Sequence, residues 1–259
     1  MATVQNFIKK YNIKEEGGKY YYNGDLFLGG KQKIQLPDNL TISGWLWFDF
    51  YAPIIQLPKN LTVGGMINLG DHTQITQLSE NLIVGEGLYI HGTQITQLPD
   101  NLIVGGNLSI ATTQIAQLPD NLTVGGKLNL YNTRITQLPD NLTVGGDLCL
   151  SDMITQLPNN LIVGGDIYPK EQLTNPDNYK KLPRNHIFTW QNGKYIKLDG
   201  IFFEFIKKES EMYIVRHIGH KDLTYVVTDG VHFGLGKTVE EAERVLLLRT
   251  SKRGTRKRK

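Results

Sequence analysis

The stretch from Gln117 to Thr136 reads QLPDNLTVGGKLNLYNTRIT, and near-copies of it recur along about half of the chain. The leucine that opens its Leu-Pro-x-Asn-Leu motif (Leu-Ser in one copy) recurs at steps of 21, 21, 20, 20, 20 and 19 residues: Leu36, Leu57, Leu78, Leu98, Leu118, Leu138 and Leu157. Repeats of this length are typical of solenoids, whose stacked turns bury a core that one turn alone cannot bury. The sequence therefore predicts a mainly β chain with a parallel-β solenoid of about seven turns over residues 36–167.

The pattern inside one repeat separates a buried face from an exposed face. Leu128 and Leu130 alternate with Lys127, Asn129 and Tyr131. This period of two predicts a short strand with two leucines pointing inward and three side chains pointing outward. A Gly-Gly pair just before the strand is expected to make the corner that leads into it.

Two columns of polar residues keep the same register as the leucines. We expect both columns to be stacked inside the solenoid, where they would satisfy backbone groups at corners that no strand ladder reaches. One column is asparagine and the other is threonine: Asn39, Asn60, Asn81, Asn101, Asn121, Asn141 and Asn160, and Thr73, Thr93, Thr113 and Thr133.

The stretch Leu108–Leu118 (LSIATTQIAQL) resembles the leucine-rich-repeat core L-x-L-x-x-[N/C]-x-L-x-x-L, with Thr113 at the Asn/Cys position. The short period and the Leu-Pro step are similar to those of bacterial leucine-rich-repeat proteins and of repeat proteins from gut bacteria and their phages. The resemblance implies a curved solenoid that binds protein partners. The full family motif has one more leucine, three residues before this core. Here glycine stands at that position, as Gly105, Gly125 and Gly145. A three-faced parallel β-solenoid therefore stays open as an alternative.

The segments that flank the repeats lack their pattern. Residues 1–35 are expected to form an N-terminal cap, with a helix over 3–13 and a hairpin over 19–28 that turns at Asn23-Gly24. Residues 168–185 contain three prolines and are expected to be a linker. Residues 186–250 predict a small antiparallel β-sheet followed by one helix, which a capping box of Thr238 and Glu241 would begin.

The basic residues are concentrated at the end of the chain. The net charge is +3, yet residues 252–259 carry six basic residues and no acid, which leaves −3 on the rest. This tail, from residue 251 to 259, is the part of the sequence that could contact phosphates. No signal-peptide core and no apolar run of about 20 residues is present, so we expect a cytoplasmic protein with no membrane partner.

Catalytic and metal-binding motifs are not found in the sequence. The histidines lack the His-Glu-x-x-His spacing, and neither a phosphate-binding Gly-x-x-x-x-Gly-Lys-Ser/Thr loop nor a Gly-x-Ser-x-Gly elbow occurs. The single cysteine, Cys149, stands where neighbouring repeats carry Asn129 or Ser109, which marks it as a strand-face residue. We therefore expect a non-enzymatic protein without cofactor or metal.

Two functions remain as hypotheses, and the oligomeric state stays open in both. The first is a protein-binding scaffold that recognises its partner through the exposed strand face, where aromatic side chains favour partner contacts. The residues expected to bind are Trp45, Trp47, Tyr89, His91, Asn129 and Tyr131. The alternative is a nucleic-acid-associated protein that uses the basic tail, through Lys252, Arg253, Arg256, Lys257, Arg258 and Lys259.

Overall fold

The computed structural model of the chain describes residues 4–30, 35–49, 54, 56–70, 74–183 and 186–254, without the side chains of 252–254. The chain divides into two units, Met1–Pro183 and Arg184–Lys259, and each is described by itself. The first unit begins with helix α1 (Val4–Lys10), and the second ends with helix α2 (Val239–Gly254).

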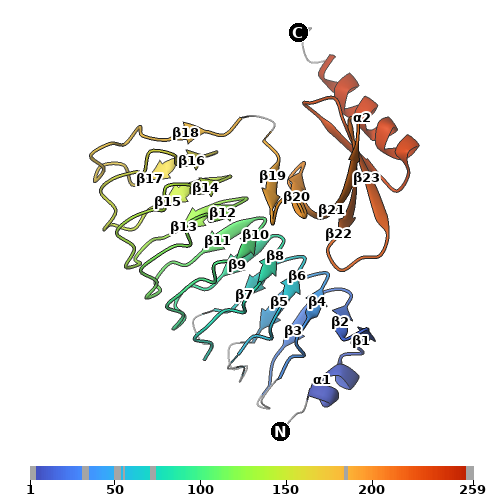
Figure 1. The fold of residues 1–259 in the computed structure, drawn as a ribbon, viewed down its shortest axis with the longest axis horizontal. Helices are drawn as coiled ribbons and strands as arrows, with labels where there is room; N and C mark the ends of the chain where they lie inside the picture. Colours follow the sequence, from blue (N-terminus) through green and yellow to red (C-terminus); the bar gives the residue numbers. More distant parts are fainter. Residues whose placement is uncertain are drawn as a thin grey trace. The chain divides into compact units, whose positions relative to one another are not determined.

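The first unit is a parallel β-solenoid of about eight turns built on two sheets (Figure 1). We call the ten-stranded one sheet A; apart from the antiparallel β1–β2 pair, its neighbours run parallel. Its strands in spatial order are β1 (Lys14–Glu16), β2 (Lys19–Tyr22), β4 (Leu40–Ile42), β6 (Thr62–Val63), β8 (Ile83–Val84), β10 (Ile103–Val104), β12 (Thr123–Val124), β14 (Thr143–Val144), β16 (Ile162–Val163) and β18 (Lys180–Lys181).

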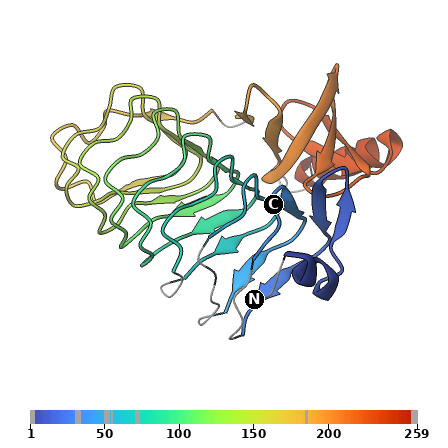
Figure 2. The ribbon, with the colours of Figure 1, turned by 60° about the horizontal axis from the view of Figure 1, so that its bottom comes forward.

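The second sheet of the solenoid, sheet B, has eight parallel strands, which Figure 2 shows side by side. They are β3 (Leu26–Leu28), β5 (Leu46–Phe48), β7 (Ile67–Asn68), β9 (Gly87–Tyr89), β11 (Asn107–Ser109), β13 (Leu128–Asn129), β15 (Leu148–Cys149) and β17 (Ile167–Tyr168). The parallel-β solenoid predicted from the repeat is confirmed, with about eight turns in place of seven.

Each turn has a third side, which carries the Leu-Pro-x-Asn-Leu motif and no strand within the described turns. Successive turns still meet there through single hydrogen bonds, such as the one from Arg134 N to Ile115 O at 3.2 Å. In the regular turns Pro-x-Asn-Leu closes a β-turn, with Leu122 N donating to Pro119 O at 3.2 Å. Two sides of the solenoid are therefore sheets, and the third is a stack of turns.

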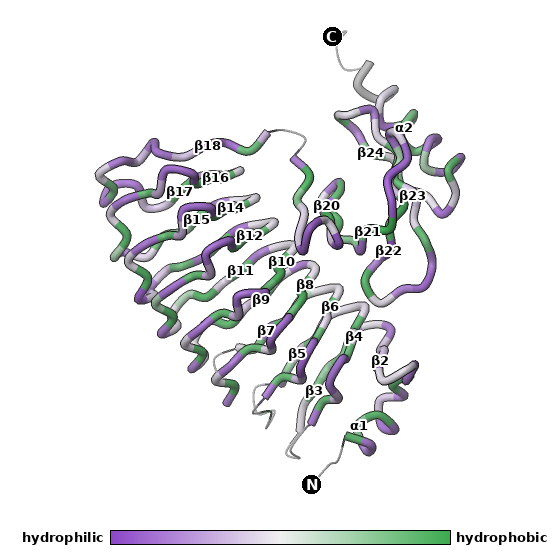
Figure 3. Tube along the Cα trace, viewed as in Figure 1, coloured by the Kyte–Doolittle hydropathy of each residue, from purple (hydrophilic) through white to green (hydrophobic). Residues whose placement is uncertain are grey.

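The core of the solenoid is one continuous stack of aliphatic side chains. Leu108, Ile110, Leu128 and Leu130 are fully buried, as the period of two predicts. The apolar residues of the third side, such as Ile135, reach the same core. Figure 3 shows apolar and polar residues alternating along the turns. Since each turn covers the apolar face of its neighbour, burial of the leucines favours stacking of the whole unit.

The threonine column is buried, as the sequence predicts, although Thr73 lies outside the described residues. Each hydroxyl donates to the carbonyl oxygen three residues earlier, at 2.7 to 2.8 Å: Thr93 to Ile90, Thr113 to Ile110 and Thr133 to Leu130. These bonds satisfy both the buried hydroxyl and a carbonyl at the corners that follow β9, β11 and β13.

The asparagine column lies on the outside of the solenoid, so the prediction that it is buried is wrong. Asn60 Nδ2 donates to Asn39 Oδ1 at 2.8 Å, and Asn81 Nδ2 donates to Asn60 Oδ1 at 3.0 Å. Asn39, Asn60 and Asn81 have φ between 54° and 59°, a conformation that asparagine tolerates better than most residues. At a solvated corner their amides bond to the next turn without the cost of burying a polar group.

The hairpin predicted across Asn23-Gly24 is not present. Strands β2 and β3 belong to different sheets and pair in parallel with β4 and β5, so Asn23-Gly24 is the corner of an additional first turn. Leu26 and Leu28 are each 1% exposed, because β3 stacks on β5 and the two leucines join the solenoid core. A two-stranded hairpin would have buried neither leucine as fully. The antiparallel pair of this region is β1–β2.

Residues 168–183, expected as part of a linker, form the last turn of the solenoid. Strand β18 pairs in parallel with β16, and Leu173 belongs to the buried core. The side chain of Asn175 accepts from Leu157 N at 2.8 Å and donates to Leu157 O at 2.9 Å. The first unit therefore ends at Pro183, beyond the predicted repeat boundary at 167.

The second unit is a six-stranded antiparallel sheet with one helix, as predicted. Its strands in order are β19 (Phe188–Trp190), β20 (Tyr195–Leu198), β21 (Ile201–Glu209), β22 (Met212–His217), β23 (Leu223–Thr228) and β24 (Phe233–Gly236), of which β24 was not expected from the sequence. Helix α2 packs on β23 and β24. Thr238 Oγ1 accepts from Glu241 N at 3.2 Å, which places the cap at the predicted residue.

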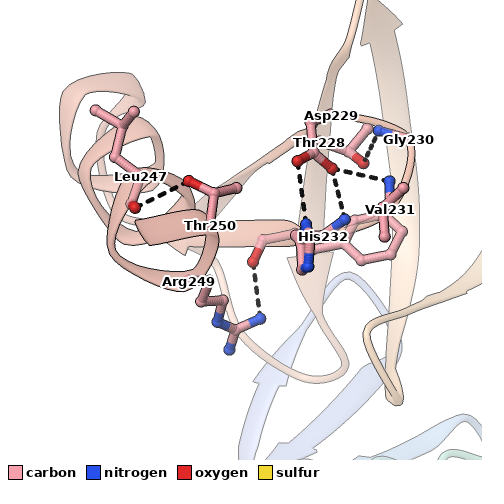
Figure 4. A network of polar contacts seen from close by, with 9 residues as sticks. Thr228, Asp229, Gly230, Val231, His232, Leu247, Arg249 and Thr250 are labelled. Carbon is pink, nitrogen blue, oxygen red and sulfur yellow. Dashed lines mark hydrogen bonds and ion pairs between the residues drawn. The ribbon is translucent and has the colours of Figure 1, made fainter. Parts of the chain in front are cut away.

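A polar turn joins β23 and β24 (Figure 4). Asp229 Oδ1 accepts from the backbone N–H groups of Val231 and His232 at 2.8 and 2.6 Å, and Asp229 Oδ2 contacts His232 Nδ1 at 3.1 Å. These donors lower the pKa of Asp229 to about 2, the backbone N–H of His232 contributing most. Nearby, Arg249 of α2 donates to Phe233 O at 2.7 Å, which ties the helix to the start of β24.

Candidate binding surface

The outward face of sheet B presents a central column with one residue from each of its eight strands. The register places these residues directly beside one another, at strand spacings of about 4.8 Å. The column reads Phe27, Trp47, Asn68, Tyr89, Ser109, Asn129, Cys149 and Tyr168. Aromatic rings thus lie at both ends of the column, and polar side chains fill most of its middle.

This face carries most of the exposed aromatic side chains of the first unit. Phe27 is 62% exposed, Trp45 and Trp47 are each 40% exposed, Tyr131 is 58% exposed and Tyr168 is 50% exposed. Their strands are held in place by the buried core on the other face of the sheet. Large rings on a rigid surface are the side chains that most often dominate binding energy at protein interfaces.

Trp45 is held in place by neighbours from three turns. Its backbone N–H donates to Asp25 Oδ1 at 2.8 Å, and its indole Nε1 donates to Glu86 Oε2 at 3.0 Å. Its ring covers Gly65, where a Cβ would lie 2.1 Å from Trp45 Cδ1. A plug at the junction with the N-terminal cap, the other role open to Trp45 and Trp47, does not fit their exposure.

Tyr89 lies flat along the sheet. Its ring covers Gly87, where a Cβ would lie 2.7 Å from Tyr89 Cε2, and its hydroxyl accepts from Asn107 Nδ2 at 3.4 Å. Tyr89 is therefore only partly exposed. Its ring is a fixed part of the surface.

The other predicted site residues lie on or beside the same sheet. Asn129 is in the central column, and its Oδ1 accepts from Tyr131 N at 3.1 Å. His91 and Tyr131 each follow the second inward residue of their turn, at the edge of the face; His91 is half-buried and Tyr131 is exposed. The structure thus brings the six predicted partner-binding residues to one face, with Trp45 and Trp47 at its N-terminal end.

Carboxylates outnumber cations on this face. Asp25, Asp49, Glu86, Asp147 and Asp166 stand at its outward or corner positions, whereas the basic residues at such positions among the described ones are Lys127 and Lys170. At the C-terminal end, Lys181 Nζ lies 3.5 Å from Asp166 Oδ1. The negative charge of Asp166 also raises the pKa of the nearby Tyr168 hydroxyl.

Two exposed aromatic residues of this face, Phe27 and Tyr168, were missed by the sequence reasoning. The signal for Phe27 was available, because Asn-Gly-Asp-Leu-Phe-Leu over 23–28 aligns with Ser-Gly-Trp-Leu-Trp-Phe over 43–48 at a step of 20 residues. Interpreting Asn23-Gly24 as a hairpin turn hid that register. Tyr168 follows the last inward isoleucine, Ile167, and was assigned to the linker.

The residues of the predicted nucleic-acid site lie mostly beyond the described part of the chain. The backbone of Lys252 and Arg253 continues helix α2, which ends at Gly254. The other four calls, Arg256, Lys257, Arg258 and Lys259, fall outside the described residues.

Among the described residues, no group of three or more His, Cys, Asp or Glu side chains is arranged to hold a metal ion. Within the same residues, no helix is long and apolar enough to cross a membrane. Comparison of the chain with protein-family models, curated proteins and solved structures found no match. The outward face of sheet B is thus an ordered surface with exposed rings and carboxylates, an arrangement suited to non-covalent binding.

Proposed function

We propose that this chain is a non-enzymatic scaffold that binds a protein partner through the outward face of sheet B. The observation that carries the proposal is the aromatic content of this face: five rings between 40% and 62% exposed, on or beside strands anchored in the solenoid core. The exposed ring surface is not needed to fill the solenoid core, whereas partner surfaces are rich in such residues.

The regular stacking of the turns supports the same function. A bound partner loses less of its binding energy when the surface that receives it is already ordered. The hydrogen bonds of Trp45 and Tyr89 hold these rings before any partner arrives. We further propose that the turns are of the leucine-rich-repeat type of bacterial and phage proteins, which the motif around Thr113 supports, and that the protein acts in the cytoplasm.

The proposal is tested by capture of partners from the cells that make the protein, with tagged full-length chain as bait. The variant Trp47→Ala/Tyr131→Ala removes two exposed rings whose side chains have no hydrogen bond in the described structure. Its melting temperature should fall only slightly, since both rings lie outside the solenoid core. Capture of the partner, quantified by mass spectrometry, should fall at least about tenfold.

The matched control is Tyr21→Ala. Tyr21 lies on strand β2 of sheet A, beside Thr41, and flanks two tyrosines that pack on the core. The Tyr21→Ala substitution therefore removes one ring from the other sheet, and capture of the partner should be unchanged. A partner that binds the double variant at full strength would contradict the proposal, as would the absence of any protein captured specifically by the wild type.

A further inference from the structure

The N-terminal end of the sheet B face combines three aromatic rings with three carboxylates. Trp45 directly precedes strand β5 and Trp47 lies on it, on either side of the inward Leu46, so both project outward about 6.8 Å apart. Phe27 pairs directly with Trp47 on the neighbouring strand, about 4.8 Å away. We call Phe27, Trp45 and Trp47 the aromatic patch. It offers adjacent ring faces on which flat or cationic groups can stack.

The carboxylates of this end surround the aromatic patch. Asp25 precedes Phe27 by two residues and accepts from Trp45 N. Asp49 follows Trp47 by two residues, and Glu86 accepts from the indole of Trp45. Each hydrogen bond uses only one carboxylate oxygen, which leaves Asp25 Oδ2 and Glu86 Oε1 as further acceptors. Acceptors and ring faces thus lie together on one surface.

Among the described residues, the two carboxylates that contact Trp45 are not paired with a cation. Within the described residues, neither Asp25 nor Glu86 has an ion pair, whereas Asp166 at the opposite end lies 3.5 Å from Lys181. Among the described residues from Asp25 to His91, the outward positions of sheet B carry no lysine or arginine; Lys127 is two turns further on. A solvated surface with uncompensated carboxylates attracts positively charged partners and repels acidic ones.

We propose that the partner segment bound here is an extended basic peptide, whose arginine or lysine side chains stack on the aromatic patch while their N–H groups donate to Asp25 and Glu86. This inference rests on the proposed function and names the chemistry of its partner. Cations are attracted to the faces of tryptophan rings, and arginine also stacks flat on them. A purely apolar partner would gain nothing from the carboxylates, and their desolvation would oppose its binding.

The surface is already arranged for such a ligand. The bond from Trp45 Nε1 to Glu86 and the contact of the ring with Gly65 fix the indole plane. Glu86 replaces the glycine that other turns carry at this corner, such as Gly65, Gly106 and Gly126. This substitution places a carboxylate beside the aromatic patch, within hydrogen-bond distance of Trp45.

The test uses a fluorescein-labelled peptide, TSKRGTRKRK, which copies residues 250–259 and carries six basic residues. Its matched control is TSQQGTQQQQ, in which glutamine replaces each basic residue. Binding to the full-length chain is measured by fluorescence anisotropy at 50 and 300 mM salt. The basic peptide should bind, its affinity should fall steeply as salt rises, and the glutamine peptide should bind at least about tenfold more weakly.

The decisive variant is Asp25→Asn/Glu86→Gln, which keeps the oxygen acceptors for Trp45 and removes two negative charges. Binding of the basic peptide should weaken at least about tenfold, while the melting temperature stays close to that of the wild type. Glu86→Gln alone, expected to weaken binding about threefold, serves if the double variant folds poorly. Lys127→Gln, which changes charge two turns away, is the control and should not weaken binding.

Three outcomes would overturn the inference: no binding of the basic peptide, equal binding of both peptides, or undiminished binding by both neutralised variants. Failure here is distinguishable from failure of the proposed function. If the peptide does not bind but capture of the native partner still requires Trp47 and Tyr131, the scaffold function stands and its partner is not basic. If the peptide binds but capture of the native partner does not depend on Trp47 and Tyr131, the function assigned to this face is contradicted.

Discussion

Gly106 lies against the carbonyl oxygen of Glu86 on the preceding turn, so closely that a Cβ on Gly106 would sit 1.5 Å from that oxygen. The residue is not among the glycines with positive φ, so an L-residue could adopt its backbone conformation. Close approach of successive turns is therefore what requires glycine here. At this corner between sheets A and B the two turns pack backbone against backbone, and no space is left for a side chain.

Gly106→Ala should destabilise the solenoid by about 3 kcal/mol, because the two turns must separate to admit a methyl group. Gly146→Ala, at an equivalent corner where the nearest atom would lie at 3.0 Å, should cost clearly less. Urea unfolding followed by circular dichroism measures both changes. Equal losses for the two variants would show that the close contact at Gly106 is not what requires the glycine.

Ser79→Pro should stabilise the first unit by roughly 1 kcal/mol. Ser79 stands where most turns carry proline, it is 6% exposed, and its Oγ has no hydrogen-bond partner among the described residues. Proline already occupies this position at Pro58, in a turn whose asparagine has the same backbone conformation, so strain is not expected.

Two contributions to this gain are expected: loss of an unpaired buried hydroxyl and lower flexibility of the unfolded chain. Ser79→Ala separates them. It removes the unpaired hydroxyl but leaves the unfolded chain as flexible as before, so it should deliver only part of the stabilisation. The free energies of unfolding of both variants are measured by urea titration. Destabilisation by the proline variant would show that the backbone N–H of Ser79 is needed in the native turn.

The Asp229 carboxyl should titrate with a pKa of about 2, which an NMR titration of its carboxyl carbon can measure. A carboxyl whose pKa is lowered by folding stabilises the folded state above its unfolded value, and that contribution is lost as the pH falls toward 2. Asp229→Asn should therefore differ most from the wild type above about pH 4 and converge with it near pH 2. A native pKa near 4 would contradict the hydrogen bonds from Val231 and His232.

Truncation after Gly254 should leave the melting temperature unchanged and weaken any binding of nucleic acid. Helix α2 continues to Gly254, and Thr250 and Ser251 bond back to carbonyls within it, so a cut after Thr250 would remove helical residues. The later cut removes four basic residues. Electrophoretic mobility shifts at several salt concentrations are the measurement. Full-strength binding by the truncated chain would place the contact elsewhere.

Much of the fold was predictable because the same pattern of residues recurs in several turns. Leu108 and Leu128 could be assigned to the core from spacing alone, since each position recurs in several turns and a strand places every second side chain on one face. Thr238 and Glu241 marked the start of α2 for a similar reason, because capping depends on a few neighbouring residues. These features are local, or local and repeated.

The ends of the solenoid and the nature of the binding surface were decided only by the tertiary structure. Asn23-Gly24 is suited to a hairpin or to a solenoid corner, and stacking of Leu26 on Leu46 selects the corner. Because Asn23-Gly24 forms a corner, Phe27 lies on the outward face beside Trp47. The bond between Trp45 and Glu86 joins residues 41 positions apart, a separation at which sequence spacing gives no geometry. By itself the sequence determined the period and the inward residues, whereas parallel stacking decided which outward side chains meet, because those contacts exist only between turns.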